Sequence, residues 1–388
     1  MKPVKRPFLA AVTAAFALSC LLGSNQPVHA QLAVHHAHHR AQQGVIGLDV
    51  YRDGTVIHLL AGEQKGEEMS LWHRRSDDAG GTWSAPVRVD GPGARPRPAR
   101  RGDEAQIAAR GDTLLAIWSV TGSGWGGSGP LASAISHDGG RTWLPGARPS
   151  DSGLTKGEGF ADLAVDQEAF HAVWLDSRDG KHGLRYTASP DGTAWSANAT
   201  VAAPTCICCW NTLLAREGML RVLFRGDDPR DMELASRSKQ AWKTGGTVGE
   251  FGWHIKGCPE AGGGLAETAD EALHALVWTG LEGRTGLYVV HSRGSAGWMT
   301  PRRIGGKDAQ HGDLAANALR LAAVWDEKGA ILAAFSADSG KSWGAPVRLT
   351  SDVGALNPRV VAAGEGFLVL WTQKGADGAN GLGMRRMN

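Results

Sequence analysis

The sequence predicts an all-β protein that folds as a β-propeller, a ring of four-stranded antiparallel blades. The chain has 15 Trp among 388 residues, and this excess indicates one structural role that is repeated many times. Most of the tryptophans form two series, and members of the second series recur at intervals of 46 to 56 residues. That interval suits one four-stranded blade, and no segment shows the sustained 3.6-residue period that is typical of a helix.

The first tryptophan series ends a local motif, S-x-D-x-G-x-[T/S]-W, in three intact and three shortened copies. The intact copies cover residues 76–83, 136–143 and 336–343, and the shortened copies cover 189–195, 236–242 and 292–298. The aspartate can accept hydrogen bonds from backbone N–H groups of a tight turn, and the tryptophan can fill space between sheets. We therefore expect these turns to join the third and fourth strands of each blade. The motif aspartates are Asp78, Asp138, Asp191 and Asp338.

The other strands of each blade follow from apolar runs and turn residues. A first strand ends at a turn such as 110–112, and a second strand carries a large aromatic residue. The third strand ends in the motif, and the fourth resembles the short run 85–89. The second-strand aromatic residues are Trp118, Trp174, Phe224, Trp278, Trp325 and Trp371.

The number of blades follows from the number of motifs. Six motifs, each with three strands before it and one after it, predict six complete blades between Val45 and Leu349. Three further strands are predicted at 357–363, 367–373 and 382–387. A strand at 32–38 would complete a seventh blade and close the ring, which removes exposed sheet edges. Seven blades are favoured, and six remain possible if the last strands form an appended ribbon. Residues 45–388 are expected to form a single domain.

The intact motif resembles the Asp-box, also called the BNR repeat, of the sialidase-like propeller superfamily. The resemblance implies a sialidase-like fold with the boxes on the side away from the active site, and it says little about chemistry. Sialidases of this superfamily use three arginines, a tyrosine with a glutamate, and an aspartate at the mouth of the central channel. Tyr51, Tyr186 and Tyr288 are predicted to lie away from that mouth, so no sialidase catalytic set is recognisable.

The N-terminal residues predict an export signal. Basic residues precede an apolar run at 8–23, and small residues at 28–30 suit a signal peptidase. We expect cleavage of residues 1–30 and a periplasmic or secreted protein, with a lipoprotein at Cys20 as the alternative.

Charge and hydropathy exclude two classes of partner. The signal carries three of the 41 basic residues and no acidic one, so the mature chain has 38 Lys and Arg against 39 Asp and Glu. This near-neutral balance supplies no basic face for nucleic acid. No other apolar run is long enough for a transmembrane segment.

The cysteines that remain after removal of the signal are Cys206, Cys208, Cys209 and Cys258. They precede the first strands of two adjacent blades, so we expect them near one end of the channel. Two interpretations remain open. An even number of cysteines in an exported chain favours two disulfides, one of them a vicinal Cys208–Cys209 bridge. Alternatively, the sulfurs form a soft-metal site with help from His254 or His311, since thiolates select Cu(I) or zinc.

A second metal-capable feature lies in the His-rich stretch 31–44, directly after the expected cleavage site. Its clustered histidines are His35, His36, His38 and His39. Four imidazoles in five residues can bind Cu(II), Ni(II) or Zn(II). A solvated linker is the alternative, and the same stretch supplies the predicted closing strand.

Charged residues at the predicted beginnings of first strands are candidates for ligand binding at the channel mouth. They are Asp103, Glu104, Glu158, Asp313 and Arg359. Paired acids suffice for glycoside hydrolysis, and the same residues can cap strands or bind a hard cation. A metal ion or small ligand in the central channel is therefore an expected partner.

Three functions remain open at this point. The preferred hypothesis is an exported propeller that binds a soft metal, copper with zinc as the alternative, through the cysteine cluster, and handles metal without catalysis. The first alternative is a carbohydrate-active glycoside hydrolase of exo-sialidase-like type or a glycan-binding lectin. The second is a disulfide-stabilised scaffold for a periplasmic protein partner.

Overall fold

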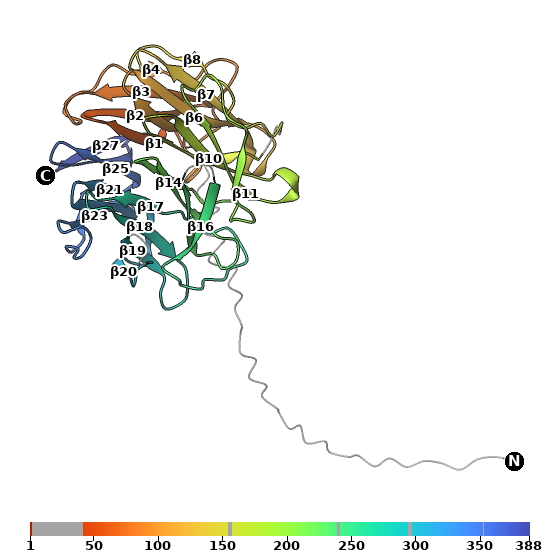
Figure 1. Ribbon diagram of the computed structural model, residues 1–388, viewed down its shortest axis with the longest axis vertical. Coiled ribbons are helices and arrows are strands. Elements are labelled where there is room, and N and C mark those ends of the chain that lie inside the picture. The colour runs from red at the N-terminus through yellow and green to blue at the C-terminus, as the bar shows by residue number, and fades with distance from the viewer. Residues whose placement is uncertain (2–41, 154–156, 239–240, 294–296, 352) are drawn as a thin grey trace. The chain divides into compact units, whose positions relative to one another are not determined.

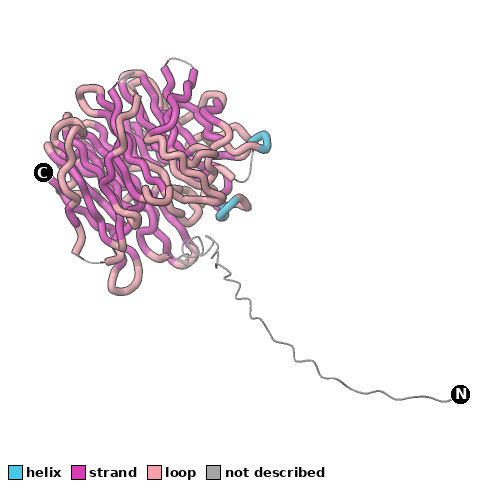
Figure 2. Tube along the Cα trace, turned by 90° about the horizontal axis from the view of Figure 1, so that it is seen from below, coloured by secondary structure: helices cyan, strands magenta, loops and turns pink. Residues whose placement is uncertain are grey.

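The computed structural model describes Met1 and residues 42–153, 157–238, 241–293, 297–351 and 353–388. The expected signal, the predicted closing strand 32–38 and the histidines at 35–39 lie outside the described residues. Gln42 to Asn388 form one compact unit, whose described part consists of strands and loops apart from two short helices, which are cyan in Figure 2. Two short 3-10 turns are η1 (Trp125–Gly127) and η2 (Arg178–Gly180). No helix in this part of the chain has the length and apolar character needed to cross a membrane.

The first six blades each have four antiparallel strands, paired in sequence order. The first blade contains β1 (Gly44–Asp53), β2 (Val56–Lys65), β3 (Glu68–Ser76) and β4 (Val87–Arg88). The second contains β5 (Gln106–Arg110), β6 (Thr113–Thr121), β7 (Ser128–Ser136) and β8 (Leu144–Pro145). The third contains β9 (Gly159–Val165), β10 (Phe170–Asp176), β11 (Gly183–Ser189) and β12 (Ala199–Ala202).

The remaining blades continue the same order. The fourth contains β13 (Thr212–Arg216), β14 (Met219–Arg225), β15 (Met232–Ser238) and β16 (Ala241–Val248). The fifth contains β17 (Gly264–Glu267), β18 (Ala272–Thr279), β19 (Gly286–Arg293) and β20 (Arg302–Gly305). The sixth contains β21 (Ala309–Asn317), β22 (Arg320–Glu327), β23 (Ala330–Ser336) and β24 (Val347–Arg348). The seventh has three described strands, β25 (Ala355–Ala363), β26 (Gly366–Lys374) and β27 (Asn380–Met387).

The seven blades close into a ring. The first strands β1, β5, β9, β13, β17, β21 and β25 each contact the next one in this order, and β25 contacts β1. Seven clusters of buried apolar side chains fill the seven spaces between neighbouring blades. Figure 1 shows the closure, with the red strands of the first blade beside the blue strands of the last. The favoured prediction of a seven-bladed, all-β propeller is therefore confirmed.

The repeated aromatic residues fill the spaces between blades. Trp174 and Trp325 have no exposed surface, and Trp118 is 3% exposed. A motif tryptophan, Trp343, packs in the same cluster as Trp325. Each such side chain removes about 150–250 Å² of surface from water, so both tryptophan series stabilise the contacts between blades.

The repeated motif forms a hydrogen-bonded turn after the third strand of its blade. One carboxylate oxygen of Asp138 accepts the backbone N–H groups of Arg141 and Thr142 at 2.9 Å, and the other accepts the Thr142 hydroxyl at 2.6 Å. These contacts, with a hydrogen bond from Ser136, hold the pKa of Asp138 well below its usual range. The other two intact copies share this arrangement, and the copy at 189–195 makes a shorter version. The predicted hydrogen bonds from the turn backbone to the motif aspartate are confirmed.

Candidate functional site

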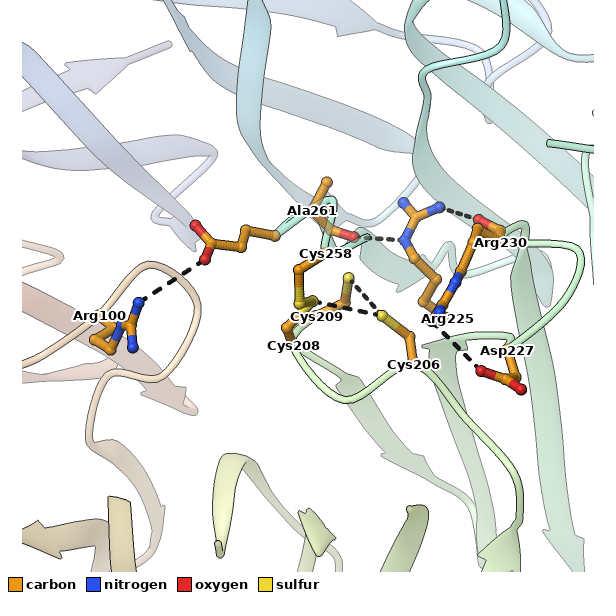
Figure 3. Close-up of a disulfide and its surroundings, with 10 residues drawn as sticks. Arg100, Cys206, Cys208, Cys209, Arg225, Asp227, Arg230, Cys258 and Ala261 are labelled. Atoms are coloured by element: carbon orange, nitrogen blue, oxygen red, sulfur yellow. Dashed lines mark hydrogen bonds and ion pairs between the residues drawn. A yellow bond between two sulfur atoms is a disulfide. The ribbon is translucent and has the colours of Figure 1, made fainter. Parts of the chain in front are cut away.

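The four sulfur atoms lie where two long connections meet at one end of the ring. Residues 203–211 join β12 to β13, and residues 249–263 join β16 to β17. Both lead from the outermost strand of one blade to the innermost strand of the next, so they approach the centre from the same end. Figure 3 shows the cysteine side chains gathered between these connections.

One disulfide joins the described cysteines. Cys208 is bonded to Cys258, with Cα atoms 6.0 Å apart, and Cys206 and Cys209 are free thiols. The vicinal Cys208–Cys209 bridge is therefore wrong, because Cys208 bonds across the boundary between two blades instead. Only two of the four sulfurs are thiols in this state.

Cys206 is the sulfur that ionises most readily. Its Sγ lies 3.3 Å from Cys209 Sγ and 3.7 Å from Cys208 Sγ. These three residues are at most 1% exposed, whereas Cys258 is half-buried. The hydrogen bond from Cys209 lowers the pKa of Cys206, and the nearby Arg225 guanidinium lowers it further. Burial, together with the same contact, raises the pKa of Cys209.

A buried guanidinium accompanies the thiols. Arg225, at the end of β14, is 1% exposed, and its hydrogen bonds go to the carbonyl oxygens of Ala261, Arg230 and Trp278. It also lies 5.4 Å above the ring of Trp253. It has no carboxylate partner in the part of the chain that the structure describes. A buried cation without an anionic partner favours ionised thiols beside it.

Neither predicted histidine belongs to the sulfur cluster. The group of close potential ligand atoms consists of three of the cysteines, among the described residues. His254 is exposed and pairs with Asp228 at 2.6 Å. His311 pairs with Asp326, and its ring stacks on Trp210 with centroids 6.1 Å apart.

A small pocket opens at the centre of the ring. It has a volume of about 20 Å³ and its lining includes Glu104, Trp210, His311 and Arg359. Glu104 Oε2 lies 3.5 Å from the Arg359 guanidinium. Neither Glu104 Oε2 nor His311 Nε2 has a hydrogen-bond partner within the described ranges. Burial lowers the pKa of His311, so the ring is neutral near pH 7 and Nε2 can accept a hydrogen bond.

Three carboxyl groups on first strands connect neighbouring blades. Asp49, Asp162 and Asp313 each accept a backbone hydrogen bond from the first strand of the next blade. The donors are Ile107, Leu213 and Val360. Although each side chain keeps some exposure towards the centre of the ring, burial raises the pKa of Asp49 to about 6 and that of Asp162 to about 8. Sequence reasoning missed Asp49 and Asp162, although the segment D-L-A occurs at both 162–164 and 313–315.

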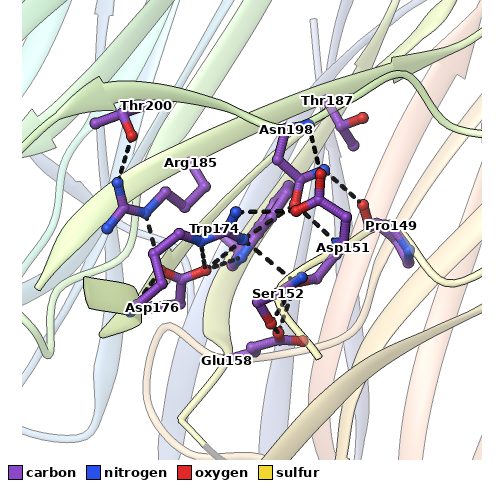
Figure 4. Close-up of polar contacts among 12 residues, drawn as sticks. Pro149, Asp151, Ser152, Glu158, Trp174, Asp176, Arg185, Thr187, Asn198 and Thr200 are labelled. Atoms are coloured by element: carbon purple, nitrogen blue, oxygen red, sulfur yellow. Dashed lines mark hydrogen bonds and ion pairs between the residues drawn. The ribbon is translucent and has the colours of Figure 1, made fainter. Parts of the chain in front are cut away.

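Two of the predicted channel-mouth acids are held in structural contacts. Glu158 is completely buried, accepts the backbone N–H of Leu131 at 2.8 Å, and belongs to a network of polar side chains (Figure 4). Asp103 forms an ion pair with buried Arg97. Glu104 and Asp103 thus each have one oxygen that is ion-paired with an arginine without a hydrogen bond, and of the two it is Glu104 that lines the small pocket with His311.

Comparisons with known proteins show the fold. The sequence matches no protein-family model and no curated protein. Polysaccharide lyase Uly1 is similar at a TM-score of 0.55 and 10% identity, over 90% of each chain. The sialidase of Trypanosoma rangeli gives 0.50 and 12%, over 89% of this chain and 55% of that chain. The GH74 enzyme of Niastella koreensis gives 0.51 and 16%, over 88% and 51%. At these identities the likeness shows a sialidase-like propeller fold alone.

Proposed function

We propose that this β-propeller binds Cu(I) through the Cys206 and Cys209 thiolates and serves in metal handling, without catalysis of its own. The observation that carries the proposal is a pair of buried thiols 3.3 Å apart beside Arg225, a buried guanidinium whose described partners are carbonyl groups. Thiolates are soft ligands that select Cu(I), and a neighbouring positive charge favours their ionised form.

The ligand set suits Cu(I) better than zinc. Structural zinc sites hold four protein ligands, and the Cys208–Cys258 bond leaves two thiols, with neither predicted histidine in the group. Two thiolates and one Cu(I) ion carry a single net negative charge, which the Arg225 guanidinium can balance. The Cys206 and Cys209 sulfur atoms belong to a group that lies within 4.8 Å of one another, so one small ion can contact both thiolates.

The expected N-terminal features support the same role. A cleaved signal at 1–30 would deliver the protein to the periplasm or the medium. The histidines at 35–39 are suited to Cu(II), so the mature chain would carry ligands for both oxidation states of copper.

Competition with a chromophoric Cu(I) chelator under anaerobic conditions tests the proposal. We expect one tightly held ion per chain, and binding at least about tenfold weaker in Cys206→Ser and Cys209→Ser, because each variant removes one of two ligands. The matched control is the double variant Cys208→Ser/Cys258→Ser, which keeps both thiols and should keep the affinity. Binding that is lost in this control and retained in the single variants would overturn the assignment.

A second candidate function is saccharide binding at the centre of the ring, by a lectin or a glycoside hydrolase. His311 Nε2, which has no hydrogen-bond partner within the described ranges, lines one pocket with the Glu104–Arg359 ion pair, and such groups suit sugar hydroxyls. A cleft of about 250 Å³, lined in part by Asp103 and Ile207, offers room for a longer chain. The similar solved structures include a polysaccharide lyase and a sialidase.

Calorimetric titration with neutral and acidic oligosaccharides tests this second candidate. We expect a heat of binding that is lost in His311→Ala, because the variant removes Nε2, the acceptor that has no hydrogen-bond partner in the described part of the chain. Absence of binding by the unchanged protein, or equal binding by the variant, would exclude it.

A further inference from the structure

The cysteine cluster holds a disulfide and free thiols in direct contact, which is what thiol–disulfide exchange requires. Exchange begins when a thiolate attacks one sulfur of a disulfide and the other sulfur leaves. Cys206 Sγ lies 3.7 Å from Cys208 Sγ, which is van der Waals contact for two sulfur atoms. Cys206 is therefore placed as the attacking group, and Cys258, the partner of Cys208, as the leaving group.

The two bonded sulfurs differ in their access to solvent. Cys208 has no exposed surface, whereas Cys258 is half-buried and follows the exposed residues Lys256 and Gly257. A thiol released at Cys258 is therefore close to solvent, and a thiol released at Cys208 is not. When Cys206 attacks Cys208, the reactive thiolate is therefore no longer at buried Cys206 but at Cys258, close to the surface.

We propose that the cluster is a thiol–disulfide exchange relay, in which Cys206 exchanges with the Cys208–Cys258 bond and presents Cys258 as a surface thiol to the disulfide of a partner protein. This activity goes beyond metal binding and needs no metal. Bound Cu(I) would occupy Cys206 and stop the exchange, so the metal-free protein is the active form.

The step balances without an added oxidant or reductant. The Cys206 thiolate forms a bond to Cys208 Sγ, the Cys208–Cys258 bond breaks, and the electron pair leaves on Cys258 Sγ. The proton that Cys206 gave up passes to solvent, and the negative charge now lies on Cys258 Sγ. The Cys258 thiolate can then attack a partner disulfide, which forms a mixed disulfide and releases the second sulfur of the partner as a thiol.

The fold holds the segment around Cys258 without the disulfide. On one side, Trp253 is buried against Trp278, with ring centroids 5.3 Å apart. On the other side, the Ala261 carbonyl accepts a hydrogen bond from Arg225 at 2.7 Å. Release of Cys258 therefore frees the residues between these anchors and leaves the blades packed.

Disulfide mapping after native alkylation tests the relay. Metal-free protein is treated anaerobically with N-ethylmaleimide, without denaturant, then digested without reductant and examined by mass spectrometry. We expect label at Cys258 and a new Cys206–Cys208 disulfide, which increase together with time. A Cys208–Cys258 bond that stays intact while Cys206 or Cys209 takes up the label would overturn the proposal.

Two variants separate the relay from general opening of the loop. Cys206→Ser removes the attacking sulfur and should slow the labelling of Cys258 at least about tenfold. Cys209→Ser is the comparison variant, because it keeps Cys206 and the disulfide, and its hydroxyl can replace the thiol as the hydrogen-bond donor to Cys206. Labelling of Cys258 should slow less in this variant than in Cys206→Ser. Equal labelling of Cys258 in Cys206→Ser would contradict the relay. The disulfide map of the unchanged protein decides the question independently of how either variant folds, and independently of any affinity for Cu(I).

Discussion

The motif turns and the cysteine connections lie at opposite ends of the blades, and their polar groups find their hydrogen-bond and charge partners in different ways. The turns follow third strands and the connections precede first strands, so antiparallel pairing separates them by the length of a strand. In the turns, a half-buried aspartate such as Asp138 accepts hydrogen bonds from its own segment. In the connections the thiols are buried beside Arg225 of β14, which is also buried, and the charges of these groups depend on a second segment. The polar groups of the repeated turns thus find their hydrogen-bond partners within one segment. The polar groups of the candidate site depend on partners from another segment of the chain.

Replacement of Arg225 should have the largest effect on stability. Arg225→Met leaves three half-buried carbonyl groups without the donor that Arg225 supplies, so we expect the free energy of unfolding to fall by about 3–5 kcal/mol. Urea unfolding followed by tryptophan fluorescence measures the loss. The control is Arg216→Met on β13, whose side chain is 30% exposed, so that water can replace its contacts, and which should cost less than about 1 kcal/mol. A variant at Arg225 as stable as the unchanged protein would show that the buried charge has no structural role.

A change in a motif turn should have an intermediate effect. Gly140 has a φ of +87°, and a Cβ there would overlap the imidazole of buried His73. We expect Gly140→Ala to lower the free energy of unfolding by about 2–4 kcal/mol, through backbone strain and overlap. Gly54→Ala is the control, since Gly54 has a φ of +59° and open space around it, and it should cost about 1 kcal/mol. If urea unfolding gives equal losses, His73 does not restrict the turn.

The smallest effect should come from Asp162 and should depend on pH. Burial keeps the pKa of Asp162 near 8 in the folded protein, whereas an unfolded aspartate ionises near pH 4. Between these values the folded state binds the additional proton, so this carboxyl lowers the free energy of unfolding as pH rises. Asp162→Asn keeps an oxygen for the Leu213 N–H. The full difference between the two pKa values corresponds to about 5 kcal/mol, and solvent that reaches this half-buried carboxyl reduces it. We therefore expect the variant to be about 1–2 kcal/mol more stable than the unchanged protein at pH 8, with little difference at pH 4.

Asp138→Asn supplies the control of opposite sign for the pH dependence. Hydrogen bonds from Thr142 lower the pKa of Asp138, so its charge contributes stability that is present above pH 4 and lost at lower pH. Thermal unfolding should therefore show Asp138→Asn less stable than the unchanged protein across the whole range from pH 4 to pH 8, with the difference shrinking only below pH 4. An Asp162→Asn protein that is also less stable at pH 8 would mean that the buried carboxyl is ionised.

Most of the fold could be predicted because its signals are local. Each motif copy lies within a single blade, and so does each second-strand tryptophan. Each blade buries its apolar faces against the next blade. The strands expected at 357–363, 367–373 and 382–387 correspond to β25, β26 and β27. Closure of the ring depends on the contact of β25 with β1, which joins the two ends of the chain.

The candidate site could be predicted only in part because it depends on contacts between segments. The sequence places the cysteines before the first strands of two adjacent blades. It does not show whether Cys208 or its neighbour Cys209 bonds to Cys258, because that depends on the path of the backbone. Arg225 gives no sequence signal, because it ends a second strand beside the expected aromatic residue Phe224. Its burial against carbonyl groups of the following connection is visible only in three dimensions.

X-ray absorption at the copper edge of the Cu(I)-loaded protein tests the proposed metal site most directly. We expect two sulfur neighbours and no nitrogen or oxygen ligand, with the Cys208–Cys258 bond intact in a disulfide map of the same sample. We also expect this signal to disappear in the Cys206→Ser variant. Copper coordinated by nitrogen or oxygen alone, or a chain that retains no Cu(I), would contradict a site formed by Cys206 and Cys209.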